Sequence, residues 1–490
     1  MLIKNNPLIE QIIKNCNKYP NTKIIFDNKK SLTYKKLVNL ALANSYNLKK
    51  IKSNYIPIII DRNVESVIAI LSVIFAGKIF CPISNSFPKE RINLFIEMLK
   101  SPFLINCSKK KFRIKNQKKI SLNSSLKLIN GSFDIKSLDK NFYLLFTSGT
   151  TGHPKGVKLS YENILNTLVW SKTYLNWNNQ KIGIATQFSF DISMFDLFSG
   201  LYFATPMYIL SEPTNPIISL KEIRKNKITS IFCVPTFFSN FIKYGLIKKS
   251  FKPLKQIISG GDFFANKDVY MWLKYKKQIA IFNVWGPTET SIVNTMYRIK
   301  KKDIKNILNG KSIPVGKSHP LMELKILKDK KEIKKNKAGE ICMIGKSVSL
   351  GYLGNSKNSK NYFLYKSKKA YLTGDLGYLD DRNYLHIIGR KDNTIKISGF
   401  RIDVLEIENL INFHFINTRA YLFKSKRLGL DILCLAVETR NTKKEKILNF
   451  LKRKLPNYFI PKKTILFEKF PLNQNNKIDR KRIESNFDER

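Results

Sequence analysis

Residues 147–157 read Thr147-Ser148-Gly149-Thr150-Thr151-Gly152-His153-Pro154-Lys155-Gly156-Val157, a segment rich in hydroxyl groups and glycine that includes one lysine. Such a loop can hold a polyphosphate, because free backbone N–H groups and a cation face the oxyanions. The apolar run at residues 142–146 precedes it and predicts a buried strand, so the loop would leave the edge of a sheet. The spacing is not that of a Walker loop, since Lys155 follows a proline. Nucleotide binding is therefore the leading interpretation, and a surface turn is the alternative.

Length and composition predict a globular protein. The chain has 490 residues, which suffices for roughly two to four folding units with their own cores. Its hydrophobic content of 43% excludes a disordered protein. The longest apolar stretch, residues 64–80, is shorter than a membrane span and predicts a buried helix. Residues 1–7 lack the features of a signal peptide, so we expect a cytoplasmic protein without membrane insertion.

The formal charge of +51 does not by itself indicate nucleic-acid binding. The 87 basic residues are spread over the whole chain, whereas a nucleic-acid-binding protein gathers them on one face. We therefore expect no nucleic-acid partner, although the charge could steer an acidic protein toward the chain. The six cysteines form no C-x-x-C pair and lie mostly in apolar runs, so we expect reduced core residues with neither zinc nor disulfides.

The hydrophobic pattern predicts the α/β class. Short apolar runs alternate with helix-like stretches up to about residue 283, and short strands with glycine-containing turns follow from residue 313 to 386. We expect a large N-terminal domain, residues 1–390, built of α/β subdomains and a β-rich subdomain. A small, mobile α+β C-terminal domain, residues 391–490, would follow it.

Four further segments carry residue types that suit a nucleotide. The segment 257–262 ends a predicted strand with two glycines, which let a flat ring approach the backbone. The segment 283–290 offers Trp285 for stacking on a base and Glu289 for Mg²⁺, which prefers few carboxylates together with phosphate oxygens. Asp375 could accept both ribose hydroxyls, and Arg390 supplies a cation. Each segment taken alone could also be an ordinary turn.

Taken together, these segments resemble the adenylate-forming superfamily of acyl- and amino-acid-activating ligases. The resemblance is closest to stand-alone adenylation domains of nonribosomal peptide synthetases and to D-alanine:carrier-protein ligases. It extends over ordered motifs at residues 32–37, 76–82, 147–157, 188–191, 257–262, 283–290, 338–341, 371–376, 389–392, 397–402, 455–461 and 476–480. In one departure from the family pattern, Asn476 stands where glycine usually precedes the motif lysine.

The resemblance implies that a carboxylate attacks the α-phosphate of ATP and that pyrophosphate leaves. Lys477 in the C-terminal domain would be the catalytic residue that bridges the two, and Glu289 would bind Mg²⁺. Asp375 would hold the ribose. The implied ATP-binding residues are Thr147, Ser148, Gly149, Thr150, Thr151, Gly152, Lys155, Gly260, Gly261, Asp262, Asn283, Val284, Trp285, Gly286, Pro287, Thr288, Asp375, Arg390 and Lys477.

Asp191 is the residue that bears on the choice of carboxylic acid substrate. By resemblance, an aspartate in the Phe-Asp-x-Ser pattern pairs with the α-ammonium group of an amino acid, and a lone carboxylate in an apolar pocket is costly without a cation. The alternative is a helix N-cap, with which Ser193 could help. The implied pocket is mostly apolar and favours a neutral amino acid; its residues are Asp191, Ile192, Phe195, Thr236, Ile258, Gly260, Val284, Ile292, Val293 and Lys477.

The resemblance also implies a second half-reaction, in which the thiol of a phosphopantetheine group attacks the aminoacyl-adenylate. Asp392 would be the hinge of the small domain, and Gly399 would line the thiol channel, although a structural glycine is equally compatible with that position. The chain ends at Arg490, so we expect it to load an acyl or peptidyl carrier protein in trans. We also expect a monomer.

The predicted function is thus ATP- and Mg²⁺-dependent activation of a neutral amino acid and its transfer to a carrier protein. The alternatives are an acyl-CoA synthetase for a small or fatty carboxylic acid, which would not need Asp191, and a non-catalytic scaffold that only binds nucleotide.

Overall fold

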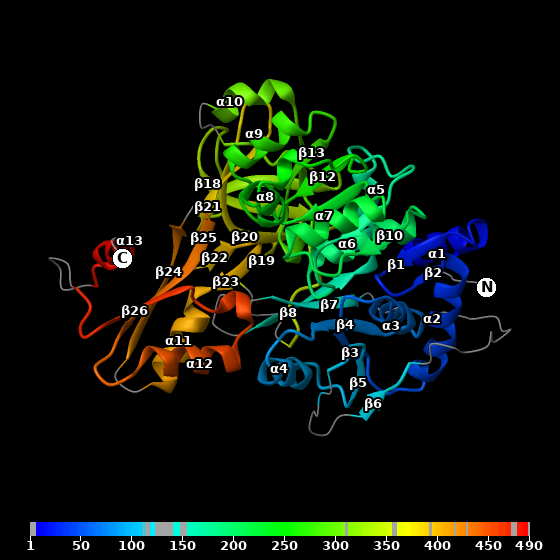
Figure 1. Ribbon diagram of the computed structural model, residues 1–490, viewed down its shortest axis with the longest axis horizontal. Coiled ribbons are helices and arrows are strands. Elements are labelled where there is room, and N and C mark those ends of the chain that lie inside the picture. The colour runs from blue at the N-terminus through cyan, green and yellow to red at the C-terminus, as the bar shows by residue number, and fades with distance from the viewer. Residues whose placement is uncertain are drawn as a thin grey trace. The chain divides into compact units, whose positions relative to one another are not determined.

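The computed structural model describes residues 6–110, 112, 118–122, 141–147, 154–308, 312–354, 360–391, 394–415, 418–427, 430–471 and 478–488. Two compact units make up the chain. The larger unit comprises Met1–Asn85, Ile96–Leu145 and Gly156–Gly389, and the smaller one Ser86–Phe95, Phe146–Lys155 and Arg390–Arg490. Figure 1 labels the helices and strands. None of the helices in the described ranges is long and apolar enough to cross a membrane.

The largest sheet has nine strands and is mostly parallel. Its central strands are short apolar runs, as expected for strands that are covered on both faces. Parallel pairs join β1 to β10, β10 to β9, β9 to β11, β11 to β12 and β12 to β13. In spatial order the strands are β15 (Lys317–Ser318), β14 (Thr295–Ile299), β13 (Ala280–Trp285), β12 (Gln256–Ser259), β11 (Ser230–Cys233), β9 (Ile182–Ile184), β10 (Met207–Ile209), β1 (Lys23–Phe26) and β2 (Ser31–Thr33).

A second sheet has six strands. Counted in spatial order from β6 at one edge, each of the first four strands pairs in parallel with the next, and the fifth strand is β7. Arg62 follows β3 and connects the two sheets. Its Nε donates to the carbonyl of Leu210 at 2.6 Å, and its Nη2 donates to the carbonyl of Ile184 at 2.8 Å. Burial lowers the pKa of Arg62 to about 10, so it stays charged at neutral pH. In spatial order the strands are β6 (Lys118–Ile120), β5 (Phe103–Asn106), β3 (Tyr55–Ile60), β4 (Ile79–Ser84), β7 (Asn141–Thr147) and β8 (Lys155–Ser160).

Helices cover both faces of the nine-stranded sheet. Successive side chains of each strand point to opposite faces, so each strand contributes residues to two different cores. Ile257 and Ile281 belong to the core beneath α7, α8 and α9, whereas Ile258 and Phe282 belong to the core that holds α6. The helices of this region are α1 (Pro7–Lys18), α2 (Tyr34–Lys49), α3 (Val64–Phe75), α4 (Lys89–Leu99), α5 (Tyr161–Ser171), α6 (Asp191–Tyr202), α7 (Pro216–Lys225), α8 (Pro235–Lys243), α9 (Asn266–Tyr275) and α10 (Ile304–Leu308), with the 3₁₀ turns η1 (Leu246–Lys248), η2 (Thr288–Thr290) and η3 (Lys301–Asp303).

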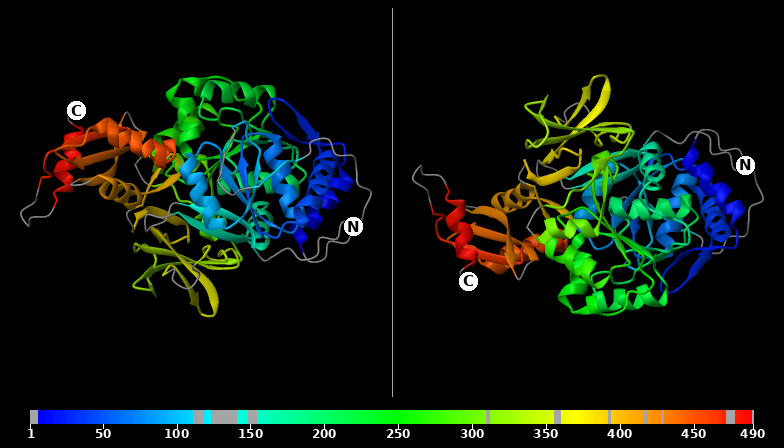
Figure 2. Two further views of the ribbon diagram at one scale, coloured as in Figure 1. Left: turned by 90° about the horizontal axis from the view of Figure 1, so that it is seen from below. Right: turned by 90° about the horizontal axis from the view of Figure 1, so that it is seen from above.

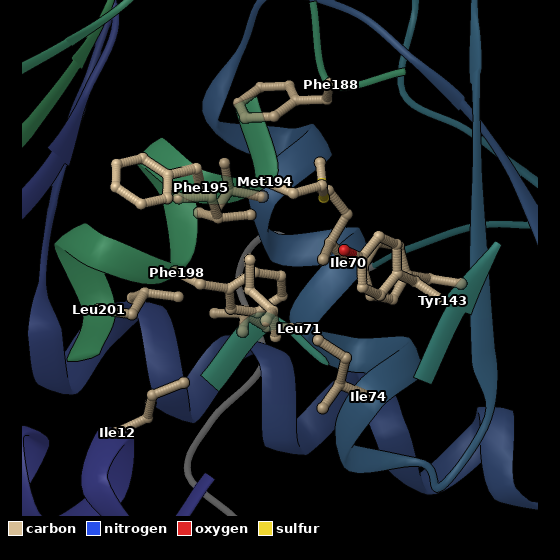
Figure 3. Packing of buried hydrophobic residues seen from close by; sticks show 14 of the residues in the cluster. Ile12, Ile70, Leu71, Ile74, Tyr143, Phe188, Met194, Phe195, Phe198 and Leu201 are labelled. Carbon is tan, nitrogen blue, oxygen red and sulfur yellow. The ribbon is translucent and has the colours of Figure 1, made fainter. Parts of the chain in front are cut away.

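Helix α6 lies between the two sheets. Phe195 packs edge-on against Phe232 of β11, with ring centroids 5.5 Å apart. Phe198 packs against Phe142 of β7, also at 5.5 Å. Figure 3 shows Met194 and Phe198 within the same core as Leu71 of α3. A helix that is apolar on all sides must be buried on all sides, and α6 meets this condition because it has a sheet on each side.

A third sheet, in the β-rich part of the larger unit, is antiparallel. Its core includes Ile341, Met343 and Tyr371 and also takes in Trp285 from the end of β13. The sheet therefore packs at the end of the nine-stranded sheet. Its strands are β16 (Met322–Lys328), β17 (Lys331–Glu332), β18 (Gly339–Gly345), β19 (Tyr362–Tyr365), β20 (Lys368–Leu379) and β21 (Leu385–Arg390).

The smaller unit has its own α+β core. A hairpin of β22 (Thr394–Ile397) and β23 (Phe400–Asp403) precedes a sheet of β24 (Arg419–Arg427), β25 (Leu430–Glu438) and β26 (Lys463–Phe467). Leu433 and Leu435 share a core with α11 (Val404–His414) and α12 (Lys444–Lys454), while Cys434 and Ala436 share one with α13 (Arg480–Asp488). The turn η4 (Asn457–Phe459) completes this unit. Figure 2 shows it in orange and red from two further directions.

His319 is held in its neutral form inside the larger unit. Its Nε2 lies 2.9 Å from the carbonyl of Asn166 in α5, and its Nδ1 accepts a hydrogen bond from the backbone N–H of Leu321 at 2.9 Å. An imidazole that accepts at one nitrogen and donates at the other is neutral. Burial lowers the pKa of His319 below its usual value.

This neutral histidine predicts a loss of stability in mild acid. The folded pKa lies below the unfolded value of about 6.5, so the unfolded state binds more protons and the free energy of unfolding falls as pH drops through that window. One such group contributes at most about 1.4 kcal/mol per pH unit. We expect urea titrations at pH 7.5 and 5.5 to differ less in His319→Gln than in the wild type. An equal difference in both proteins would assign the acid sensitivity to other groups, such as His386, whose pKa burial also lowers.

Candidate active site

The predicted site residues of the larger unit gather at one edge of the nine-stranded sheet. Strands β9, β11, β12 and β13 run parallel, so their carboxyl ends meet at the same edge. Ligands of open parallel sheets bind in the crevice outside this edge. The residues that lie there are Thr236, Ile258, Gly260, Gly261, Asp262, Asn283, Val284, Trp285, Gly286, Pro287, Thr288 and Glu289.

Gly260 and Val284 are in tight contact at this edge. A Cβ atom on Gly260 would lie 2.6 Å from Cγ2 of Val284 and 2.7 Å from its carbonyl oxygen. The next residue, Gly261, has φ +85°, a conformation that favours glycine. Both glycines are therefore required by backbone geometry, and the approach of a flat ring to this backbone remains a prediction.

Asp191 is the first residue of α6 and is half-buried. Its Oδ2 accepts a hydrogen bond of 2.6 Å from the hydroxyl of Thr288, and its Oδ1 accepts one of 2.8 Å from the N–H of Ile192. Burial raises the pKa of Asp191, and the bond from Thr288 opposes that rise. The carboxylate is thus partly desolvated at the site edge.

The alternative reading of Asp191 as the N-cap of α6 does not match the cap geometry. The N-cap residue is Phe190, whose side chain cannot accept a hydrogen bond, and the hydroxyl of Ser193 donates to the carbonyl of Phe190 at 2.6 Å. Asp191 still lies in the first turn, where the helix dipole favours a negative charge. One of its oxygens, however, is bound by Thr288, a residue 97 positions away.

The predicted pocket residues form one hydrophobic cluster. Ile192 and Phe195 come from α6, Ile258 and Val284 from strand ends, and Ile292 and Val293 from the segment after η2. Thr236 lies half-buried in the first turn of α8. The structure therefore brings together apolar groups that are far apart in the sequence, and it places the carboxylate of Asp191 beside Ile192.

Ile292 has a backbone conformation that the sequence did not predict. Its φ is +70°, and the preceding Ser291 has φ +69°. A positive φ is strained for a β-branched residue, and such strain persists only where surrounding contacts impose it. Here Gly286 packs against the strained segment, because a Cβ on it would lie 2.5 Å from the carbonyl oxygen of Ile292.

Asp196 is a buried acid that sequence reasoning missed. It lies on α6 with 2% of its surface exposed, and its Oδ2 has no hydrogen-bond partner among the described residues. Burial raises the pKa of Asp196 well above its usual value. Its carboxyl group thus differs from that of Asp191 on the same helix, which accepts two hydrogen bonds. The only signal in the sequence was an acidic residue within an apolar helix.

Glu289 in η2 is 2% exposed, and its Oε1 accepts a hydrogen bond of 3.0 Å from the hydroxyl of Tyr352. No group of three His, Cys, Asp or Glu side chains that could hold a metal occurs in the part of the chain that the structure describes. A single oriented carboxylate nevertheless fits Mg²⁺, which takes one or two protein carboxylates and completes its shell with phosphate oxygens and water. Glu289 therefore suits the predicted metal.

The side chains of Trp285 and Asp375 form a hydrogen bond with each other. The indole N–H of Trp285 donates to Oδ2 of Asp375 at 2.8 Å, and both side chains are buried. The ring of Trp285 packs in the core of the third sheet with Val315 and Tyr371. Stacking of this ring on a base remains a prediction, and its observed contact is with the carboxylate predicted to hold ribose.

Several predicted residues belong to the smaller unit. Thr147 ends β7, Lys155 begins β8 and Arg390 ends β21. Gly399 has φ +81° and follows Ser398 with φ +51° in the turn between β22 and β23, so hairpin geometry alone explains a glycine there. Its channel role remains a prediction. The predictions for Ser148, Gly149, Thr150, Thr151, Gly152, Asp392 and Lys477 fall outside the described residues.

Comparison with known proteins finds a matching family model and relatives of similar sequence. The family model for AMP-binding enzyme matches residues 12–353. Gramicidin S synthase 1 of Brevibacillus brevis is 30% identical over 489 residues, and the chain spans 43% of its length. The D-alanine--D-alanyl carrier protein ligase of Listeria monocytogenes serotype 4a (strain HCC23) is 30% identical over 479 residues, covering 91% of each chain.

Among solved structures, an NRPS protein containing adenylation and PCP domains superposes with a TM-score of 0.86. It is 21% identical, and the match covers 98% of this chain and 84% of that one. This likeness confirms the predicted fold class.

The Trp285 contact predicts a nucleotide-binding defect in Trp285→Phe. Removal of the indole N–H leaves the buried carboxylate of Asp375 without one donor, and a hydrogen bond to a charged group is worth about 1.5–3 kcal/mol. We expect ATP affinity, measured by calorimetry, to fall about tenfold or more. Trp272→Phe is the matched control, because that indole donates to the neutral carbonyl of Phe238 at 3.3 Å in another core. Equal ATP affinities of the two variants would contradict the role of the contact.

Proposed function

The chain belongs to the AMP-binding enzyme family, and from this premise we propose that it activates a neutral amino acid as aminoacyl-AMP. The reaction consumes ATP and releases pyrophosphate. The aminoacyl group then passes to the phosphopantetheine thiol of a carrier protein. The relative from Listeria supports amino-acid activation, since it is by name a ligase of D-alanine.

The observation that carries the choice of an amino acid is the carboxylate of Asp191. It is half-buried at the start of α6, beside Ile192 of the hydrophobic core, and it accepts a hydrogen bond from the hydroxyl of Thr288. A carboxylate in such surroundings is costly unless it meets a cation, and the α-ammonium group of an amino acid supplies one. A fatty or aryl acid would leave that carboxylate without a counter-charge.

The pocket supports a neutral side chain for the substrate. Ile192, Phe195, Ile258, Val284 and Val293 are buried apolar residues of one cluster. An acidic or basic substrate side chain would lose its hydration against them without compensation.

The adenylation step needs stabilisation of negative charge more than proton transfer, because a carboxylate attacks a phosphate and pyrophosphate leaves. When bound, Mg²⁺ neutralises charge on the phosphates. Glu289 would hold it, Asp375 would orient the ribose, and Lys477 would bring the carboxylate to the α-phosphate. Thr147 to Lys155 would hold the β- and γ-phosphates.

Transfer to a carrier protein is supported by relatives. The Listeria protein, matched over 91% of its length, is by name a ligase for a D-alanyl carrier protein. The structural neighbour described above contains a PCP domain. We propose the same chemical class of acceptor for this chain, a thiol on a phosphopantetheine arm.

The first test is exchange of labelled pyrophosphate into ATP, measured with L- and D-amino acids and with fatty and aryl acids. We expect exchange that depends on one or a few neutral amino acids. Exchange only with acids that lack an amino group would instead support an acyl-CoA synthetase. ATP binding without exchange for any acid would support the non-catalytic scaffold.

The second test is Asp191→Asn, which keeps the shape of the side chain and removes its charge. We expect kcat/KM for the amino acid to fall about 100-fold or more, mainly through KM, because loss of one partner from a desolvated charge pair costs about 2–5 kcal/mol. The matched control is Asp196→Asn on the same helix. Its carboxyl group is buried, its pKa is raised by that burial, and its Oδ2 has no hydrogen-bond partner among the described residues, so an isosteric amide should change kcat/KM by less than about threefold. Full activity of Asp191→Asn would refute the ammonium assignment.

A further inference from the structure

The carboxylate of Glu289 has a hydroxyl partner from a distant part of the chain. Tyr352, which lies beyond β18, is 63 positions from Glu289, and its hydroxyl donates to Oε1 at 3.0 Å. The backbone of Tyr352 is itself fixed, since it forms a bridge with Val157 of β8. Both side chains are buried, so water does not compete strongly for this bond.

A second tyrosine sets the direction of this hydrogen bond. The hydroxyl of Tyr371 in β20 lies 3.2 Å from that of Tyr352. An ionised carboxylate only accepts, and a phenol has one proton to donate. Tyr352 therefore donates to Glu289, and Tyr371 donates to Tyr352. The resulting chain of hydrogen bonds ends on the carboxylate.

A third tyrosine packs on these two without contacting the carboxylate. The ring of Tyr362 lies edge-on to that of Tyr352 with centroids 5.3 Å apart, and 4.7 Å from that of Tyr371. Its hydroxyl is bonded to Oγ of Ser349 at 2.6 Å. Tyr362 thus shares the burial and packing of Tyr352 but has a different hydrogen-bond partner.

The main chain at Glu289 is fixed as well. Its carbonyl accepts a hydrogen bond of 2.8 Å from the N–H of Ser349. The carboxylate that ligates a metal is oriented by groups that do not touch the metal, and their loss typically weakens metal binding by about 10- to 100-fold. Tyr352 meets the geometric requirement for such a group.

We propose that Tyr352 is a positioning residue that orients the carboxylate of Glu289 toward a divalent cation bound together with the phosphates of ATP. The inference rests on the proposed function, in which Glu289 binds that cation. Tyr352 acts through Glu289 and touches neither substrate nor metal. A purely structural role would instead make Tyr352 and Tyr362 equivalent, because both are buried members of the same aromatic cluster.

The experiment compares the full chain with Tyr352→Phe and with the matched control Tyr362→Phe. ATP binding is measured by calorimetry without any acid substrate, first in chelator and then over a series of Mg²⁺ concentrations. We expect the Mg²⁺ concentration that gives half of the increase in ATP affinity to rise about tenfold in Tyr352→Phe. It should change less than about twofold in Tyr362→Phe, and affinity in chelator should be the same in all three proteins.

A third variant keeps the test decisive if Tyr352→Phe does not fold. Tyr371→Phe removes the donor to Tyr352 but retains the bond to Glu289, so we expect a smaller rise in the same direction. Equal Mg²⁺ dependence of all proteins, or equal losses in the Tyr352 and Tyr362 variants, would overturn the inference and leave the proposed function intact. ATP binding by the wild type that is indifferent to Mg²⁺ would overturn both. Failure of pyrophosphate exchange alone would count only against the proposed function.

Discussion

The burial of α6 between two sheets is the constraint on which the site depends. Phe195 fixes the helix to β11 and Phe198 fixes it to β7, so it can neither slide nor rotate without opening a core. The first residue of this helix is Asp191. Its carboxylate is therefore delivered to the carboxyl ends of the parallel strands, where Thr288 binds it.

The acids around this edge differ in the way the protein compensates their burial. Asp375 accepts a hydrogen bond from an indole N–H and Glu289 accepts one from a phenol hydroxyl, whereas burial raises the pKa of Asp196 well above its usual value. Asp191 is half-buried and receives a hydroxyl and a backbone N–H. The four carboxyl groups therefore differ in their burial and in their hydrogen-bond partners. Among them, the half-buried Asp191 is the one that we propose for a substrate cation.

Much of the fold could be predicted from local pattern. The short apolar runs that were predicted to alternate with helices up to about residue 283 include strands β10, β11 and β12, because a short apolar run between turn signals has few alternatives. The apolar residues predicted to line the pocket all belong to one buried cluster, and their role as a pocket remains a prediction. The strained backbone of Ile292, the burial of Asp196 and the partner of Glu289 were not predicted, since nothing in the neighbouring sequence indicates them.

The sequence by itself determined which segments become helices and strands and which residue types the site contains. The reason is that hydrophobic periodicity, glycine placement and motif spacing act over a few neighbouring residues. Only the tertiary structure decided which of these residues meet. Thr288 reaches Asp191, Trp285 reaches Asp375 and Tyr352 reaches Glu289 across 97, 90 and 63 positions. Such pairings follow from strand order and from the packing of whole elements, which no local pattern encodes.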